Sequence, residues 1–203
     1  GRLERSFSPA DQELFSYLAG QAAVSLENVD LHETVQRQAV TDELTGLANR
    51  ARFDDSLAAE AERSRRFPDQ PVGLVLLDID NFKKVNDTHG HQVGDDVLRE
   101  VARIVHESSR EIDTPSRYGG EELAVILPGT DLEGAFEMAE RVRTGVEALA
   151  VPLPDGGTLG VTASFGAAAG AGDDATSESL IGAADTALYE AKRTGKNKTV
   201  RAG

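Results

Sequence analysis

The run VGLVLLDID at residues 72–80 restricts the possible folds more than any other stretch of this chain. Its side chains are apolar up to Asp78, so it does not alternate between core and solvent as a half-exposed strand does. A continuous apolar run of this kind is typical of a strand buried on both faces. Such a strand needs helices packed on its sheet, and we therefore expect an α+β or α/β sandwich.

The rest of the chain supplies helices and strands that can build this sheet. Apolar residues at helical spacing predict helices up to about Arg66 and over residues 94–110, 131–149 and 180–191. The segment SRYGGEELAVIL predicts a hairpin, in which Gly119 and Gly120 supply the positive φ angles of a tight turn. Strands are expected within residues 158–168 and 199–201, and NFKKVNDTHGHQ is expected to be a loop.

A separate helical segment precedes this region. From Ser8, a capping serine, a proline and an aspartate open a long amphipathic run. We place a domain boundary after residue 39, with a long N-terminal helix over 1–39 and the main domain over 40–203. The run resembles the closing helix of a GAF sensor domain that continues into a signalling helix. It is too short and irregular to establish a coiled coil, so a dimer contact and ordinary amphipathic packing both remain open.

Composition excludes several classes of function. The chain of 203 residues has no cysteine, which rules out thiol catalysis, disulfides and thiolate metal sites. Its formal charge of -14 opposes the phosphate neutralisation on which non-specific nucleic-acid binding depends, so we expect no nucleic-acid partner. No apolar run approaches the ~18–20 residues of a membrane helix. We expect a cytoplasmic protein that is a piece of a longer one.

Four carboxylates mark a candidate site. Asp78 and Asp80 end the apolar run on one face of the strand, because strand side chains alternate with a period of two. Glu121 and Glu122 would lie close to them if the hairpin neighbours this strand. Such a cluster repels itself unless a cation neutralises it, and Mg²⁺ with a nucleoside triphosphate is the obvious occupant. The alternative, that the two glutamates merely solvate a hairpin, remains open on spacing alone.

Five sequence blocks, in order along the chain, give it a family resemblance. They are DELTGLANR, DIDNFKKVNDTHGHQVGD, RYGGEEL, SFG and ADTALYEAKRTGKN. From about Val40 to its end, the chain resembles the GGDEF family of diguanylate cyclases. The resemblance implies a palm-like fold related to nucleotidyl cyclases, with a mostly antiparallel central sheet. It also implies condensation of two GTP molecules into cyclic di-GMP and pyrophosphate, by a homodimer of facing half-sites.

The resemblance assigns roles at the acidic site. It implies Mg²⁺, with Mn²⁺ as an alternative ion, bound by Asp78, the backbone carbonyl of Ile79 and Glu121. Glu122 would be a second metal contact or would help to deprotonate the attacking 3′-hydroxyl. Catalysis is therefore assigned to Asp78, Glu121 and Glu122, and the turn at Gly119 and Gly120 to substrate binding.

Further positions would bind GTP. The resemblance implies phosphate contacts from the backbone amides near Phe82 and Lys83, terminal-phosphate contacts from Lys192 and Lys196, and guanine recognition by Asn86 and Asp95. Without the resemblance, the two lysines would be an ordinary basic helix end, and Asp95 an ordinary acid in a first helical turn.

A second site is implied upstream of RYGGEEL. Arg110 and Asp113 match the R-x-x-D site at which the product, cyclic di-GMP, inhibits members of the family, and Arg141 can add a second guanidinium. A surface ion pair is the ordinary alternative. Near the start of the domain, Asp42 and Arg50 are expected to form an ion pair.

The sequence is compatible with three functional hypotheses. The first is an active diguanylate cyclase, the second a catalytically silent receptor that binds cyclic di-GMP or GTP, and the third a purely structural dimerisation module. The complete acidic set argues against the silent receptor, and the dimerisation module leaves that set unexplained. The active cyclase is therefore the leading hypothesis.

Overall fold

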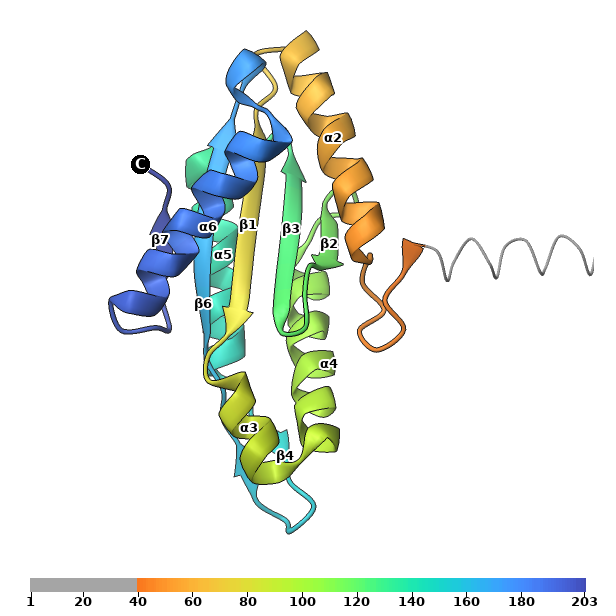
Figure 1. The fold of residues 1–203 in the computed structure, drawn as a ribbon, viewed down its shortest axis with the longest axis vertical. Helices are drawn as coiled ribbons and strands as arrows, with labels where there is room; N and C mark the ends of the chain where they lie inside the picture. The colour runs from red at the N-terminus through yellow and green to blue at the C-terminus, as the bar shows by residue number, and fades with distance from the viewer. Residues whose placement is uncertain (1–39) are drawn as a thin grey trace, which may run out of the picture. The chain divides into compact units, whose positions relative to one another are not determined.

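Strand β1 (Val72–Ile79) lies at the centre of a five-stranded sheet with the order β2-β3-β1-β6-β7 (Figure 1). The structure, a computed structural model, describes residues 40–203; the helix expected over residues 1–39 lies outside this part. Strand β1 runs antiparallel to both β3 (Glu122–Pro128) and β6 (Ala163–Gly170). At the edges, β2 (Thr114–Arg117) pairs antiparallel with β3, and β7 (Thr199–Arg201) pairs parallel with β6. The predicted α+β class, with a mostly antiparallel sheet, is confirmed.

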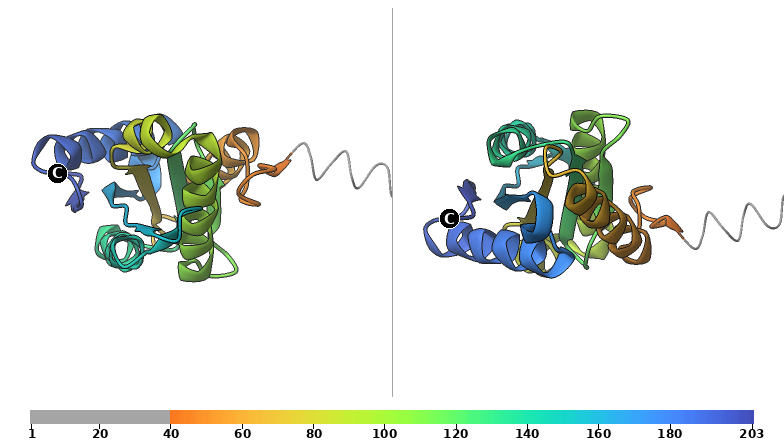
Figure 2. Two further views of the ribbon diagram at one scale, coloured as in Figure 1. Left: turned by 90° about the horizontal axis from the view of Figure 1, so that it is seen from below. Right: turned by 90° about the horizontal axis from the view of Figure 1, so that it is seen from above.

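Helices cover both faces of the sheet, as the apolar run of β1 requires. Helices α2 (Arg50–Arg66) and α6 (Ser177–Arg193) lie on one face, and α4 (His91–Ser108) and α5 (Leu132–Glu147) on the other (Figure 2). Every residue of β1 is buried. Among residues 40–203, no helix combines the length and apolar character needed to cross a membrane.

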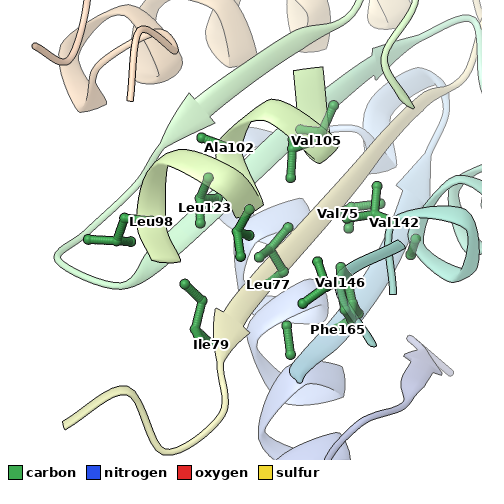
Figure 3. Packing of buried hydrophobic residues seen from close by; sticks show 14 of the residues in the cluster. Val75, Leu77, Ile79, Leu98, Ala102, Val105, Leu123, Val142, Val146 and Phe165 are labelled. Atoms are coloured by element: carbon green, nitrogen blue, oxygen red, sulfur yellow. The ribbon is translucent and has the colours of Figure 1, made fainter. Parts of the chain in front are cut away.

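The side chains of β1 divide between two hydrophobic clusters. Leu74 and Leu76 pack in the cluster that includes residues of α2 and α6. Val75 and Leu77 pack in the cluster shared with α4 and α5 (Figure 3). Each fully buried side chain of this size contributes roughly 1.5–3 kcal/mol to folding relative to an exposed one. The alternation puts Asp78 on the α6 side of the sheet, with Leu74 and Leu76.

Two local predictions were wrong. The expected loop after β1 contains helix α3 (Phe82–His89), because Phe82 and Val85 are one turn apart and both bury themselves. The hairpin turn does not use positive φ angles at Gly119 or Gly120, since neither glycine is in that region. The connection between β2 and β3 instead spans residues 118–121, so it is longer than a two-residue turn.

The remaining elements are short. Strands β4 (Val151–Pro152) and β5 (Thr158–Leu159) form a separate two-stranded sheet, and a 3-10 helix spans Gly172–Asp174. The predicted last strand at residues 199–201 is confirmed as β7. The predicted helix from Gly94 begins three residues earlier, at His91, directly after Gly90 ends α3 with a φ of 84°.

Candidate active site

The acidic residues meet where β1 ends and β3 begins. Asp78 lies opposite Glu122 in the β1–β3 register, and the backbone N–H of Ile79 donates to the carbonyl of Glu121 at 3.4 Å. The antiparallel pairing thus brings residues that are more than forty positions apart to one end of the sheet. The condition on which the acidic cluster depended, that the hairpin neighbours the apolar strand, is met in the structure.

Electrostatics at this end of the sheet favour a bound cation. Burial raises the pKa of Asp78 and the nearby Asp80 raises it further, while Lys192, whose Nζ lies 2.7 Å from Asp78 Oδ2, opposes the rise. The pKa of Glu121 is also raised, first by partial burial and then by the charge of Asp78. Neighbouring carboxylates thus disfavour the charged forms of both Asp78 and Glu121, and a bound cation beside them would relieve this.

The residues present fit a magnesium ion that takes its other ligands from phosphate and water. Within residues 40–203, no group of three or more acidic or histidine side chains is arranged to hold a metal. Mg²⁺ commonly takes only one or two protein carboxylates together with substrate phosphates. Asp78 and Glu121, beside the backbone of Ile79, would supply these one or two carboxylates.

The turn that carries the glutamates is held by the packing of Glu122 against Gly119 and by hydrogen bonds from Arg117. A Cβ at Gly119 would lie 2.5 Å from Glu122 Oε2, so the missing side chain leaves room for this carboxylate beside the turn. Arg117 donates from Nη2 to the carbonyl of Gly120 at 2.8 Å and from Nη1 to Asp42 Oδ2 at 3.1 Å. The predicted pairing of Asp42 with Arg50 is therefore wrong: Arg117 is the partner of Asp42.

Arg50 has other contacts. Its Nε lies 3.0 Å from Asp54 Oδ1, four residues along α2, and its guanidinium stacks 3.7 Å from the ring centroid of Tyr118. Sequence spacing could not reveal the Asp42 pairing, because Arg117 is 75 residues away and the contact depends on the position of β2.

The predicted phosphate-binding residues also lie near this end of the sheet. Asn81 precedes α3 in a left-handed conformation, with Phe82 buried and Lys83 exposed after it. Lys196 Nζ donates to Asn81 Oδ1 at 2.6 Å. Since Lys192 contacts Asp78, both predicted lysines reach side chains at the end of β1 or directly after it.

Asn86 and Asp95 stand on neighbouring helices. Asn86 is on α3, and its Oδ1 is buried without a hydrogen-bond partner in the part of the chain that the structure describes. Asp95, near the start of α4, is half-buried and directly follows Gly94. A Cβ at Gly94 would overlap Asn86 Oδ1. An unpaired buried amide oxygen is costly, so a ligand group is a fitting partner for it.

Gly94 is a residue of this site that the sequence reasoning missed. A glycine inside a helix costs ~1 kcal/mol relative to alanine, and this cost signals a packing reason for its presence. In the structure the reason is the close approach of Asn86.

The residues predicted for product inhibition are also brought together. Asp113 Oδ2 accepts the backbone N–H of Arg110 at 2.7 Å, and burial raises the pKa of Asp113. Its Oδ1 is buried and has no partner within residues 40–203. Arg110, Asp113 and Arg141 line one small cavity of about 40 Å³, and Arg141 donates to the carbonyl of Ser108 at 2.9 Å. The ordinary alternative, a surface pair, does not account for the burial of Asp113.

Comparison with known proteins identifies close relatives. Residues 39–198 match the protein-family model described as "Diguanylate cyclase, GGDEF domain". The chain is 46% identical over 163 residues to the response regulator PleD of Caulobacter vibrioides, which covers 80% of this chain and 36% of that protein. It is 35% identical over 194 residues to diguanylate cyclase A of Treponema denticola, covering 95% of this chain and 51% of that protein. The chain thus spans about half or less of the length of these relatives.

A solved structure shows the same fold. The coiled coil and GGDEF domain of DgcB from Caulobacter crescentus, in complex with c-di-GMP, superimposes with a TM-score of 0.87 at 34% sequence identity. The match covers 93% of this chain and 99% of the DgcB chain. The fold expected from the sequence blocks is therefore confirmed.

Proposed function

Because the chain belongs to the GGDEF family of diguanylate cyclase domains, we propose that it condenses two molecules of GTP into cyclic di-GMP. In each half-reaction the 3′-oxygen of one GTP bonds to the α-phosphorus of the other, the bond to the β-phosphate breaks, and pyrophosphate leaves. The observation that carries this proposal is the meeting of Asp78 with Glu121 and Glu122 at the end of β1, next to Lys192.

Asp78, the backbone carbonyl of Ile79 and Glu121 would hold the magnesium ion, or manganese in its place. When bound, such an ion neutralises phosphate charge and helps to activate the attacking hydroxyl. The pKa of Glu121 is raised by burial and by the charge of Asp78 even with Lys192 nearby, and this supports the assignment because a bound cation would stabilise the charged carboxylate. We assign Glu122 either a second contact to the ion or the removal of the 3′-hydroxyl proton.

The remaining residues would bind and orient GTP. Lys192 and Lys196 would bind the terminal phosphates, and the backbone amides at Phe82 and Lys83, at the start of α3, would bind the others, because N–H groups there lack helical partners. Gly119 and Gly120 would leave room for the nucleotide beside the turn. Asn86 and Asp95 would read guanine; Asn86 Oδ1 supports this role, since it is buried and has no hydrogen-bond partner in the described residues 40–203.

The reaction needs two GTP molecules, one from each of two facing half-sites, so we propose that the active form is a homodimer. We also propose that residues 1–39 are the end of a GAF-like sensor region running into a signalling helix, and that the protein acts in the cytoplasm. The DgcB fragment supports the helical part of this proposal, since it contains a coiled coil together with its GGDEF domain and the match covers 93% of this chain.

The catalytic proposal is tested with two isosteric variants, Asp78→Asn and Glu121→Gln. The wild-type protein, incubated with GTP and Mg²⁺, should form cyclic di-GMP, identified by chromatography and mass. Each variant should lose at least about a hundredfold in turnover, since removing one electrostatic contact to a transition state costs this much.

Circular dichroism serves as the control for folding of both variants. Full turnover in both variants would refute the metal assignment, and tight binding of cyclic di-GMP without turnover by the wild type would support a silent receptor instead.

We further propose that Arg110, Asp113 and Arg141 bind the product and inhibit the enzyme. Asp113 Oδ1 supports this role, because it is buried without a hydrogen-bond partner among residues 40–203 and Asp113 lines a cavity together with the two arginines. Arg110→Ala should raise the concentration of cyclic di-GMP needed for half-inhibition about tenfold or more, because a hydrogen bond to a charged group contributes about that factor. Arg99→Ala is the matched control, since Arg99 forms an exposed pair with Asp96 on the same helix that precedes Arg110. Inhibition of Arg110→Ala at the wild-type concentration would exclude this site.

A further inference from the structure

Asp80 is a buried acid to which the proposed reaction gives no role. The residue is 6% exposed, and both of its carboxylate oxygens accept hydrogen bonds. Ser164 Oγ donates to Oδ1 at 2.7 Å, and Thr162 Oγ1 donates to Oδ2 at 2.7 Å. The backbone N–H of Asn197 donates to the same Oδ2 at 3.0 Å. A buried carboxylate is retained only when it is well paired, and here its partners come from two different parts of the fold.

The first two partners belong to the central sheet and its approach. Ser164 lies on β6, and Thr162 directly precedes that strand. These bonds fasten the end of β1 to β6, which the β1–β6 ladder already does through its backbone. They are redundant for holding the two strands together.

The third partner belongs to the turn between α6 and β7, where the backbone N–H of Lys196 also donates to the carbonyl of Ala191 at 3.0 Å. Between α6 and β7, Lys196 and Asn197 both have positive φ angles, of 62° and 45°. Residues other than glycine adopt this region only at a cost, and they persist there when surrounding contacts enforce it. The Asn197 side chain contacts Arg143 at 3.1 Å and Glu147 at 2.8 Å on α5, while its backbone N–H is held by Asp80.

This turn carries one of the proposed phosphate ligands. Lys196 Nζ lies 2.6 Å from Asn81 Oδ1, and Asn81 follows Asp80 directly in the chain. Two consecutive residues therefore hold this turn. Asp80 binds the backbone N–H of Asn197, and Asn81 binds the ammonium group of Lys196. If the turn moved, the ammonium group would leave the start of α3.

We propose that Asp80 is a positioning residue, which fixes the turn at Asn197 so that Lys196 presents its ammonium group to the terminal phosphates of GTP. The inference rests on the proposed role of Lys196 in phosphate binding. It differs from a role in folding alone, because a purely structural acid would affect all nucleotides equally. A positioning residue affects only ligands that reach Lys196.

The test compares two ligands of the full chain by calorimetry, at one Mg²⁺ concentration. One ligand is a GTP analogue with a non-hydrolysable bridge between the α- and β-phosphates, and the other is GMP, which lacks the terminal phosphates. The ratio of their affinities measures what the terminal phosphates contribute. Lys196→Ala should lower this ratio about tenfold, the effect expected for one charged hydrogen bond. Asp80→Ala should lower it by a similar factor, and the double variant should lower it no further.

Two variants separate the turn from the sheet. Ser164→Ala removes the donor to Oδ1 and leaves the Asn197 bond, so the ratio should stay within about twofold of the wild type, a change smaller than one hydrogen bond produces. Asp80→Asn can keep its oxygen facing Asn197 and turn its amide toward Ser164, whose hydroxyl can also accept. The affinity ratio of Asp80→Asn should therefore lie closer to that of the wild type than to that of Asp80→Ala.

The outcomes are distinct. An unchanged ratio in Lys196→Ala would refute the proposed phosphate role of that lysine, and with it the basis of this inference. A lowered ratio in Lys196→Ala with an unchanged ratio in folded Asp80→Ala would refute the positioning role alone. If Asp80→Ala does not fold, Asp80→Ser takes its place: its hydroxyl keeps a polar group at this buried position but ends one bond short of the carboxylate oxygen that accepts from the Asn197 N–H. An unchanged ratio in Asp80→Ser would equally overturn the proposal.

Discussion

At the scale of single residues, the contact between Gly94 and Asn86 links helix packing to the proposed recognition of guanine. A methyl group at Gly94 would overlap Asn86 Oδ1 and displace the amide from its present position. Gly94→Ala should therefore raise KM for GTP about tenfold, the effect of losing one well-placed hydrogen bond. Initial rates measured over a range of GTP concentrations give this value.

The control for this substitution is Gly182→Ala on α6, where an added Cβ would meet no atom of the described residues 40–203 within 4 Å. This variant should leave KM unchanged and stabilise the fold by about 0.5–1 kcal/mol, because alanine is favoured over glycine inside a helix. Equal KM values for Gly94→Ala and wild type would show that Asn86 does not read the base from its present position.

The raised pKa of Asp78 predicts how the stability of the fold depends on pH. Its pKa is raised in the folded chain, chiefly by burial, so its contribution to stability is present below the ordinary value of 3.8 and is lost as pH rises through the folded-state pKa. Asp78→Asn is neutral at every pH and avoids this loss. The melting temperature of the variant minus that of the wild type should therefore increase between pH 4 and pH 7.

Thermal unfolding followed by circular dichroism at several pH values measures this difference. Asp96→Asn, at an exposed position on α4, is the control. A difference that falls with rising pH would mean that Lys192 outweighs burial at Asp78, and that the folded site already satisfies its negative charge.

At the scale of secondary-structure elements, the sequence was most informative where one strong pattern decided the outcome. The apolar run ending in Asp78 predicted the buried strand, and the segment SRYGGEELAVIL predicted the hairpin of β2 and β3. Helix α3 was missed because only Phe82 and Val85 in its eight residues are buried, so periodicity is weak over so short a segment. The turn at Gly119 was misread because its glycine avoids a side-chain clash with Glu122, which no rule about φ angles anticipates.

The Arg117 contacts give a prediction at this scale, since they join the segment before α2 to the β2–β3 turn. Both Arg117 and Asp42 are about four-fifths buried, with side chains 20% and 22% exposed. A double-mutant cycle with Asp42→Ala and Arg117→Ala should give a coupling free energy of about 1 kcal/mol in urea unfolding. Arg117→Ala should also lower kcat, because its bonds to Gly119 and Gly120 position the turn that carries Glu121.

Strictly additive effects of the two substitutions on the free energy of unfolding would contradict this account of the turn. Arg103→Ala is a suitable control, because Arg103 pairs only with Glu100 and Glu107 on its own helix among the described residues and should change kcat little.

At the scale of the whole molecule, the candidate site is assembled from β1, the β2–β3 turn, the start of α3 and the end of α6. Sequence blocks could name most of its residues, because the family resemblance carries them position by position. They could not show that Asp80 faces Asn197 or that Asn86 faces Gly94, because these contacts join residues through the packing of separate elements. Partners of this kind depend on the complete fold.

The proposed homodimer gives a prediction at the same scale. If two half-sites must face each other, the specific activity should rise with protein concentration until the dimer predominates, by mass action. Light scattering on the same samples should show the mass doubling over the same range. A constant specific activity from a monomer at every concentration would exclude the two half-site arrangement.

The most direct test of the central claim is to measure both products in one incubation of the wild-type protein with GTP and Mg²⁺, at a high protein concentration. The account predicts cyclic di-GMP together with two pyrophosphate molecules for each one formed, since each of the two new bonds releases one. Unchanged GTP, or pyrophosphate released without cyclic di-GMP, would contradict it.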